Sequence, residues 1–444
     1  MWAMLKDFAV AAVITAVLGI IFMTYGYVYD ALGRFADHRV LLPAAVILAL
    51  ACARLLPAFP RSVRASASFM NYVAIALLAL PLVGIGRFYL ERPQLDLATD
   101  ALSDAAAVQA GSAMPDIYYL ILDEYGREDT LTGFDNSGFL NALRDRGFYV
   151  PSQAVSNYPS TESSSPSPLN MQYYEGLEIW GDAESRAAHR MAWDNLLDRI
   201  LQGLGYRYVH VPSGFPVTDK SFNADLMVDF GPSGTILRDR EVDGSAVPLD
   251  PGVLAREVVL RTALRPFLPA GFETSFNPSY SWWHPSRALA TLEFLKRIPE
   301  FDGPVFVFAH VIKPHVPYSF DRFGNVSFDS EQGFDSDHDP SVTEPYFGQL
   351  IYLNSLVLET VDDILARSET TPIIVISADH GRRDQPGNPI NSIFVAYLLP
   401  DGGNEMLYPS ISSVNSFRVV LDYSFNLDLG LLEDRSYQVL DKNE

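Results

Sequence analysis

The sequence predicts an α/β fold, with a central and mostly parallel sheet flanked by helices and an N-terminal region of transmembrane helices before it. Two observations carry this prediction. Long apolar runs crowd residues 8–90, whereas from Pro115 onward short apolar runs of strand length alternate with helical patterns. Strands that are apolar throughout are typical of a sheet covered by helices on both faces.

Three apolar stretches near the N-terminus are each long enough to cross a bilayer. They cover residues 8–29, 40–59 and 69–90, and each can span a hydrocarbon core of ~30 Å as a helix. The first is too long for a signal peptide, lacks an A-x-A cleavage site and is followed by two more spans. Arg54 interrupts the second span. We therefore expect a membrane region over residues 1–92.

The charges of the connecting loops indicate an orientation. The 60–68 loop carries Arg61 and Arg64 without an acidic residue, which favours the cytoplasmic side. The 30–39 loop mixes both signs and suits the outside. The N-terminus would then lie inside and everything after the third span outside. The expected topology is multi-pass, with the part of the chain after the third span on the periplasmic or extracellular side.

The charge of the chain limits its partners. The formal net charge is −22, although residues 1–100 are slightly basic, so the acidic excess lies in the soluble part. Such a part is poorly suited to nucleic-acid backbones, and we expect no nucleic-acid partner. An anionic substrate must be held by a few local cations or a metal. The single cysteine, Cys52, lies in the second span and does not report the compartment.

Beyond the membrane region, residues 93–114 are small and polar and are expected to form a linker. We expect a catalytic domain over 115–405 and a C-terminal extension over 406–444 that packs on it. The 215–300 region shows no clear pattern. The expected strands lie within 116–126, 206–214, 303–311, 371–381 and 391–400, and the clearest helices within 137–148 and 350–368.

Three of the expected strands end in side chains that bind metals. Ligands of open α/β sheets bind at the carboxyl ends of the strands. Taken singly, such an Asp is usually a cap and such a His is usually packing, but their joint placement favours a metal site. Carboxylate and imidazole ligands suit Zn²⁺, which we expect, or Mn²⁺ as the alternative. The strand-end residues are Asp123, Glu124, His310, His315, Asp379 and His380.

Four motifs give the chain a resemblance to a known family. They read "LILDEYGR" (120–127), "TESSSP" (161–166), "HVIKPHVPY" (310–318) and "SADHG" (377–381). With them, most of residues 115–400 resembles the sulfatase-like branch of the alkaline phosphatase superfamily. Within that branch the chain looks like membrane-anchored phosphoethanolamine transferases and lipoteichoic acid synthases.

The resemblance implies roles for these residues. It makes metal ligands of Asp123, Glu124, Asp379 and His380, and it makes His310 and His315 part of the substrate and phosphate site. "TESSSP" fits the T-x-x-S-x-P pattern in which the Thr is the nucleophile, which implies that Thr161 is both nucleophile and metal ligand, with Ser164 as the rival. The alternative for this polar stretch is a flexible Ser/Pro linker.

The chain departs from the family pattern in two places. Sulfatases carry C/S-x-P-S-R, whereas this chain has Pro168 where the Arg would stand, so formylglycine sulfatase activity is not expected. No His follows the "DHG" motif, although many of these transferases have one. Lys313, Arg382 or Arg383 could neutralise the substrate's charge instead, although each such residue is more often an ordinary surface cation.

The expected reaction is metal-dependent transfer of a phospho-substituent of the phosphoethanolamine or phosphoglycerol type. A membrane phospholipid would be the donor, a phospho-threonine the intermediate, and a cell-envelope glycan or glycolipid the acceptor. The lipid bilayer is thus an expected partner. One alternative is a sulfatase-like hydrolase of phosphoesters or sulfate esters. Another is a non-catalytic membrane protein on this fold.

Overall fold

The computed structural model describes twelve stretches of the chain, and two compact units organise them. The units comprise residues 1–94 with 248–277, and 95–247 with 278–444. The described stretches are residues 8–32, 37–59, 61–63, 72, 114–174, 182–231, 234–239, 259, 261–267, 285–326, 343–382 and 390–437.

The first unit contains two apolar helices, α2 (Phe8–Leu32) and α3 (His38–Leu55), and α3 continues into the short helix η2 (Leu56–Ala58). Both are long and apolar enough to cross a membrane, over Val10–Tyr29 and His38–Ala58. They run antiparallel. At one end Tyr29 stacks on His38, with ring centroids 4.0 Å apart, and at the other end Val63 packs with Val10.

The first two predicted spans are therefore helices of membrane-spanning length. The third predicted span, 69–90, and the predicted linker, 93–114, lie outside the described residues except for single positions. Leu56–Ala58 and the short 265–267 turn, η5 (Arg265–Phe267), complete the named elements of this unit.

The second unit is built on one seven-stranded sheet in the order β4-β3-β2-β5-β1-β6-β7. The four pairings from β3 to β6 are parallel, and the outer pairs β3–β4 and β6–β7 are antiparallel. The mostly parallel sheet predicted from the sequence is confirmed. The strands are β1 (Ile117–Leu122), β2 (Arg207–Val211), β3 (Leu226–Gly231), β4 (Gly234–Asp239), β5 (Val305–Val311), β6 (Ile373–Ser377) and β7 (Val395–Leu398).

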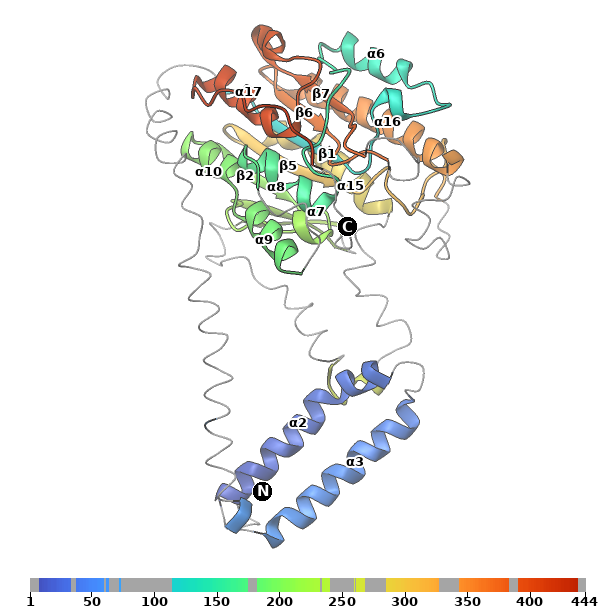
Figure 1. Ribbon diagram of the computed structural model, residues 1–444, viewed down its shortest axis with the longest axis vertical. Coiled ribbons are helices and arrows are strands. Elements are labelled where there is room, and N and C mark those ends of the chain that lie inside the picture. Colours follow the sequence, from blue (N-terminus) through green and yellow to red (C-terminus); the bar gives the residue numbers. More distant parts are fainter. Residues whose placement is uncertain are drawn as a thin grey trace. The chain divides into compact units, whose positions relative to one another are not determined.

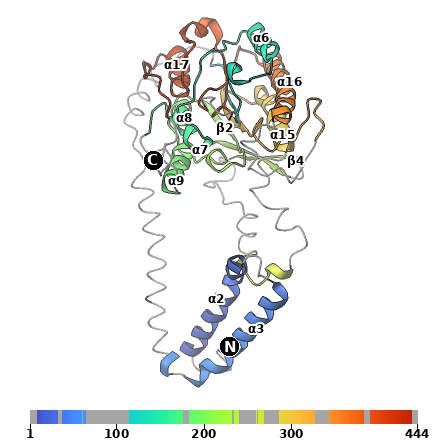
Figure 2. The ribbon, with the colours of Figure 1, turned by 45° about the vertical axis from the view of Figure 1, so that its right-hand side comes forward.

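Helices cover both faces of this sheet. Figures 1 and 2 show α6, α15 and α16 on one side and α8, α10 and α17 on the other. The helices are α6 (Ser137–Asp145), α7 (Thr161–Ser164), α8 (Pro166–Asn170), α9 (Asp182–Trp193), α10 (Leu196–Gly203), α15 (Pro285–Leu295), α16 (Thr343–Arg367) and α17 (Ser413–Phe425). Short 3₁₀ turns are η3 (Glu128–Thr130), η4 (Pro216–Thr218), η6 (Ile298–Glu300) and η9 (Pro400–Met406).

The central strands are apolar because both of their faces are covered. Every residue of β1, β5, β6 and β7 is buried, so an alternating pattern is neither needed nor seen. All five predicted strand segments contain an observed strand. The 215–300 region, which had no clear pattern, supplies β3, β4 and α15.

Candidate metal centre and nucleophile loop

The sheet brings together two carboxylates that lie far apart in the sequence. Strands β1 and β6 are parallel neighbours, with Ile121 opposite Ser377, and each strand stops within two residues of an aspartate. Asp123 and Asp379 therefore emerge side by side at the carboxyl edge of the sheet. Both are buried, with exposed fractions of 1% and 4%.

His380 completes a compact cluster with these two aspartates. One ligand atom from each of Asp123, Asp379 and His380 lies within 4.8 Å of the other two. The Nε2 atom of His380 lies 3.6 Å from Asp123 Oδ1 and 3.8 Å from Asp379 Oδ2. The imidazole is fully buried, so the three groups face one another in a medium of low dielectric constant.

The tautomer of His380 follows from its other ring nitrogen. Nδ1 lies 2.9 Å from the carbonyl oxygen of Gly381, and a carbonyl oxygen only accepts hydrogen bonds, so Nδ1 carries a proton. In the neutral ring, Nε2 then directs its lone pair toward two carboxylates. Three electron-rich groups that face one another buried in this way fit a cation held between them.

The hydrogen bonding of the carboxylates supports the same conclusion. Asp379 Oδ1 accepts from the backbone N–H groups of Glu124 and His380, at 3.1 and 2.9 Å. Asp379 Oδ2 and Asp123 Oδ1 are buried and have no hydrogen-bond donor in the described part of the chain. A buried carboxylate oxygen is costly unless a hydrogen bond or a cation compensates it. These residues fit a divalent metal ion.

Electrostatics at Asp123 agree with a site that favours its charged form. Burial alone raises the pKa of Asp123, but positive charge on His315, His310 and His380 when their rings are protonated, with a hydrogen bond from His310, outweighs that effect and lowers the pKa below its usual range. His310 contributes directly, because its Nε2 lies 3.4 Å from Asp123 Oδ2. Asp123 is therefore an anion, as a metal ligand must be.

Glu124 lies beside this cluster and faces another histidine. Its backbone is left-handed, with φ of 62°, which is uncommon for a residue that is not glycine and is found at functional sites. The twist directs its N–H to Asp379 and its carbonyl oxygen to the Tyr346 hydroxyl, at 3.0 Å. Its carboxylate Oε2 lies 4.0 Å from His315 Nε2. Glu124 is thus not a member of the compact cluster, and its metal role stays a prediction.

His315 presents the same tautomer as His380. Its Nδ1 lies 2.7 Å from the carbonyl oxygen of Val316, so Nδ1 is the donor and Nε2 faces Glu124. The two imidazole rings lie 6.5 Å apart, edge to face. The predicted histidines of "HVIKPHVPY" are therefore at the site, beside the carboxylates of the other two motifs.

Thr218 is a residue of the site that sequence reasoning missed. Its Oγ1 lies 2.7 Å from His310 Nδ1, and the Ser213 hydroxyl lies 2.8 Å from the same Oγ1. Both hydroxyls are buried, with exposed fractions of 1%. The pair holds the His310 ring so that Nε2 faces Asp123. No sequence signal could have found it, because Thr218 lies on a short turn in the region without a pattern.

We expect Thr218→Val to impair catalysis through His310. Valine keeps the shape but removes the hydroxyl, so Nδ1 loses its partner and the ring loses its orientation. Loss of such an orienting partner typically costs roughly 10–100-fold in activity. The measurement is kcat and KM for phosphodiester cleavage as a function of pH. A positioning role predicts a lower kcat, a shifted pH profile and rescue by Thr218→Ser.

The control for this variant is Thr360→Val. Thr360 is an equally buried threonine that donates to the carbonyl oxygen of Leu356, at 2.8 Å, within α16. Equal losses in the two variants, with an unchanged pH profile in both, would show that Thr218 is merely structural.

The two described basic residues predicted to bind substrate are buried, which corrects the view of them as surface cations. Lys313 donates to the carbonyl oxygen of Pro317 at 2.8 Å and to the Ser319 hydroxyl at 3.3 Å. Burial lowers the pKa of its ammonium to about 7, and the Asp123 carboxylate opposes that shift. It lines a narrow crevice together with His310 and Arg287.

Arg382 is buried as well, and its guanidinium lies over two aromatic rings. The distances from its Cζ to the ring centroids are 4.2 Å for Tyr346 and 5.0 Å for Phe347. Because Tyr346 also bonds to the Glu124 carbonyl, Arg382 is adjacent to the end of β1. A role for Lys313 and Arg382 in substrate binding stays a prediction, and Arg383 lies outside the described residues.

The loop with Thr161 is ordered and buried, which excludes the flexible Ser/Pro linker. Ser160 caps the short helix α7 and accepts from the N–H of Ser163. Thr161 is the first residue of α7 and is 4% exposed. The rival Ser164 is also buried, and its hydroxyl has no hydrogen-bond partner among the residues that the structure describes.

A single chain segment joins this loop to the metal-binding edge. The N–H of Gly381 bonds to the carbonyl oxygen of Ile390, and the N–H of Ser156 bonds to that of Asn391, at 2.8 Å. The first contact requires glycine, because a Cβ at position 381 would lie 2.5 Å from the Ser392 carbonyl oxygen. The segment 390–392 therefore lies between the end of "SADHG" and the residues that lead to Thr161.

The C-terminal residues strap the same loop in place. Asn157, fully buried, donates to the Arg435 carbonyl oxygen at 2.8 Å and accepts from the Val414 N–H at 2.7 Å. The Tyr437 N–H returns to the Asn157 carbonyl oxygen, at 2.8 Å. The ring of Tyr437 stacks on Tyr158, with centroids 5.1 Å apart. We call residues 432–437 the C-terminal strap.

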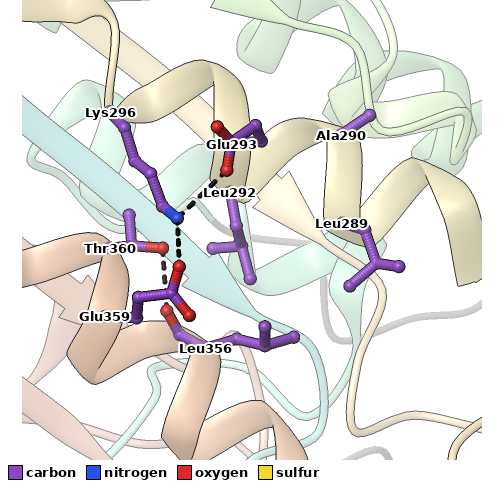
Figure 3. A pocket seen from close by; sticks show the side chains of 8 residues that line it. All are labelled: Leu289, Ala290, Leu292, Glu293, Lys296, Leu356, Glu359 and Thr360. Carbon is purple, nitrogen blue, oxygen red and sulfur yellow. Dashed lines mark hydrogen bonds and ion pairs between the residues drawn. The ribbon is translucent and has the colours of Figure 1, made fainter. Parts of the chain in front are cut away.

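A separate groove lies between α15 and α16 and contains none of the predicted site residues. It has a volume of about 360 Å³, and Figure 3 shows the Lys296 ammonium between two carboxylates. The ammonium lies 2.6 Å from Glu359 and 3.0 Å from Glu293. Asp363 lies 3.4 Å from the same ammonium, so one positive charge is shared by three carboxylates and pairs the two helices. It is lined by Leu289, Ala290, Leu292, Glu293, Lys296, Leu356, Glu359 and Thr360.

Several solved structures are distantly similar to the chain. The chain is similar to the periplasmic domain of EptC from Escherichia coli (13% identity, 70% of this chain and 82% of that one, TM-score 0.42). It is also similar to phosphoethanolamine transferase EptC from Campylobacter jejuni (12%, 71% and 90%, 0.41). A third is the integral membrane lipooligosaccharide phosphoethanolamine transferase A from Neisseria meningitidis (14%, 86% and 73%, 0.42). No curated protein sequence matches the chain.

The decisive match is to a family rather than to one protein. The model of the sulfatase family matches residues 115–392, which is more than half of the chain and includes all four motifs. An enzyme of the sulfatase-like phosphotransferase or hydrolase kind agrees with the mixed sheet and with the cluster of Asp123, Asp379 and His380 at its edge. The chain belongs to the sulfatase family.

Proposed function

We propose that the protein is a membrane-anchored phosphotransferase that moves a phosphoethanolamine-type or phosphoglycerol-type group from a phospholipid to a cell-envelope glycan or glycolipid. The observation that carries the proposal is the buried cluster in which Asp123, Asp379 and the Nε2 of His380 face one another. Such a cluster at the carboxyl edge of the sheet, with an ordered threonine loop tied to the same edge, fits phosphoryl transfer better than scaffolding.

Asp123, Asp379 and His380 would hold the metal, and the family resemblance adds Glu124 and Thr161. We propose Zn²⁺ for this donor set, with Mn²⁺ as the alternative that metal analysis would distinguish. When bound, a divalent cation lowers the pKa of a hydroxyl it coordinates and offsets the negative charge of a phosphate.

The first proposed step uses Thr161 as the nucleophile. Its Oγ forms a bond to phosphorus, and the bond from phosphorus to the diacylglycerol oxygen breaks. The threonine proton leaves to a base of the site, and the lipid oxygen takes a proton from His310 or His315. The products are diacylglycerol and a phospho-threonine whose phosphate still carries the ethanolamine or glycerol group. Thr218 keeps His310 oriented throughout.

The second step reverses the roles. A hydroxyl of the glycan attacks the same phosphorus, its proton passes to the histidine that gave one up, and Thr161 is released. Water in place of the glycan would make the enzyme a hydrolase, so the two reactions differ only in which acceptor reaches the site. The proposed location is the inner membrane, multi-pass, with the catalytic domain outside, because apolar helices hold the site near a donor that stays in the bilayer.

The test uses the full chain in vesicles that contain phosphatidylethanolamine labelled in its headgroup. We expect the label on the 157–170 peptide, and then on an added glycolipid. Release of free labelled phosphoethanolamine, with or without the glycolipid, would assign the hydrolase. The proposal would be overturned if the metal-loaded protein neither transferred label to this peptide nor released diacylglycerol.

A further inference from the structure

Residues 261–267 differ from the elements that flank them in the sequence. They follow β4 and precede α15, which belong to the second unit, called the catalytic unit from here on. The segment itself belongs to the first unit, which contains the apolar helices. The Ala263 N–H bonds to the carbonyl oxygen of Phe22 at 2.9 Å. An Arg265 guanidinium N–H lies 3.5 Å from the carbonyl oxygen of Gly26. The segment therefore packs along the second half of α2.

Two arginines of this segment lie over tyrosines at the end of the apolar span. The Arg261 guanidinium lies 4.7 Å from the ring centroid of Tyr27, and that of Arg265 lies 4.4 Å from Tyr29. The span itself ends at Tyr29. Tyrosines at the end of a transmembrane helix mark the level of the lipid headgroups. The two cations therefore lie at that level too.

The segment has the composition of an interfacial element. It reads "RTALRPF" (261–267), with two arginines and no acidic residue. Leu264 is 47% exposed and Phe267 is 72% exposed. Apolar side chains that are exposed beside a membrane-spanning helix, with cations next to them, are typical of a segment that lies in the membrane interface.

We propose that residues 261–267 form a phospholipid-binding element at the membrane interface. Leu264 and Phe267 insert among the acyl chains, and Arg261 and Arg265 bind lipid phosphates. A guanidinium suits this task, because its planar donors match phosphate oxygens while its face stays stacked on a ring. The element brings phosphate-bearing lipids to the anchor and so supplies the class of donor that the proposed function requires. That link rests on the proposed function, whereas the binding itself does not.

The insertion is tested by site-directed spin labelling of the full chain in vesicles of phosphatidylethanolamine and phosphatidylglycerol. Cys52→Ser removes the native thiol, and Phe267→Cys carries the label. Phe323→Cys is the matched control, since Phe323 is an exposed phenylalanine of the catalytic unit, at 79%. We expect the label at 267 to be accessible to oxygen and shielded from a water-soluble nickel complex. Equal nickel accessibility at 267 and 323 would overturn the insertion.

The role of the arginines is tested by lipid selectivity. Spin-labelled phosphatidylglycerol is compared with spin-labelled phosphatidylcholine for association with the full chain. Each arginine at the membrane surface should contribute roughly fivefold to the association of the anionic lipid, so Arg261→Gln with Arg265→Gln should abolish the selectivity. Arg297→Gln with Arg367→Gln, two exposed arginines of the catalytic unit, should leave it unchanged.

Equal selectivity in both double variants would remove the arginines from the proposal. Neither measurement depends on turnover. A failed insertion or selectivity test is therefore distinct from a failure of the proposed reaction, which the label on the 157–170 peptide reports.

Discussion

Thr161→Ala is expected to abolish both the covalent adduct and turnover. Alanine removes the only atom that the proposed mechanism bonds to phosphorus, while the helix cap supplied by Ser160 stays intact. Loss of a covalent nucleophile typically costs about 10⁴-fold or more. The measurements are the mass of the 157–170 peptide after incubation with labelled phospholipid, and the rate of diacylglycerol release. Thermal unfolding checks that the variant is folded.

Ser164→Ala is the matched control, since Ser164 is the rival nucleophile on the same turn. Its hydroxyl is buried, so its loss tests whether a second hydroxyl of this loop carries the chemistry. We expect activity within about tenfold of the wild type, because the adduct forms elsewhere. If Ser164→Ala lost the adduct and Thr161→Ala kept it, the assignment of the nucleophile would be reversed.

Asp379→Asn is expected to lose metal and activity and yet to be more stable than the wild type when both are stripped of metal. Asn Oδ1 still accepts from the N–H groups of Glu124 and His380. Its Nδ2 takes the place of Oδ2, which lies 3.8 Å from His380 Nε2. In the variant an N–H donor faces the lone pair of His380 Nε2, whereas in the wild type a carboxylate oxygen faces it. Removal of a buried charge whose Oδ2 has no hydrogen-bond donor among the described residues should raise the metal-free stability by about 1–3 kcal/mol.

The metal-loaded proteins should show the opposite order. A ligand at 1,000 times its Kd stabilises the folded state by about 4 kcal/mol, and only the wild type gains this amount. The measurements are metal content by mass spectrometry and unfolding by denaturant, with and without a chelator. If Asp379→Asn were no more stable than the wild type in chelator, the buried charge of Asp379 would not destabilise the metal-free protein.

Asp198→Asn is the control for this experiment. Asp198 is fully buried in α10, but both of its carboxylate oxygens accept hydrogen bonds, from Asn195 at 3.0 Å and from Asn223 at 3.2 Å. In the variant, the amide N–H group at this position would face the N–H donor of Asn195 or of Asn223. We expect lower stability with or without chelator, and an unchanged metal content.

The sequence predicted the sheet and the centre of the site because both depend on local patterns. Apolar runs gave the central strands, and parallel strands bring their carboxyl ends to one edge. Asp123, Asp379 and His380 follow directly from that rule. That such a cluster suits a divalent metal depends on the types of side chain, which the sequence gives directly.

Other features of the site depend on contacts that no local pattern encodes. Glu124 faces His315 from a left-handed backbone. A left-handed backbone at a residue other than glycine cannot be recognised in the sequence. Thr218 reaches His310 from a turn without periodicity. The side chains of Lys313 and Arg382 are buried because carbonyl groups and aromatic rings surround their charges, whereas composition alone favours the surface for both.

The C-terminal strap has a consequence for how the protein matures. The hydrogen bond between Asn157 and the Arg435 carbonyl oxygen joins residues 278 positions apart. Contacts of such sequence separation form late, and a chain emerging from the ribosome folds its earlier parts first. Translation must therefore pass residue 437 before the Thr161 loop is held in place. A nascent chain is therefore expected to stay inactive until residue 437 has left the ribosome.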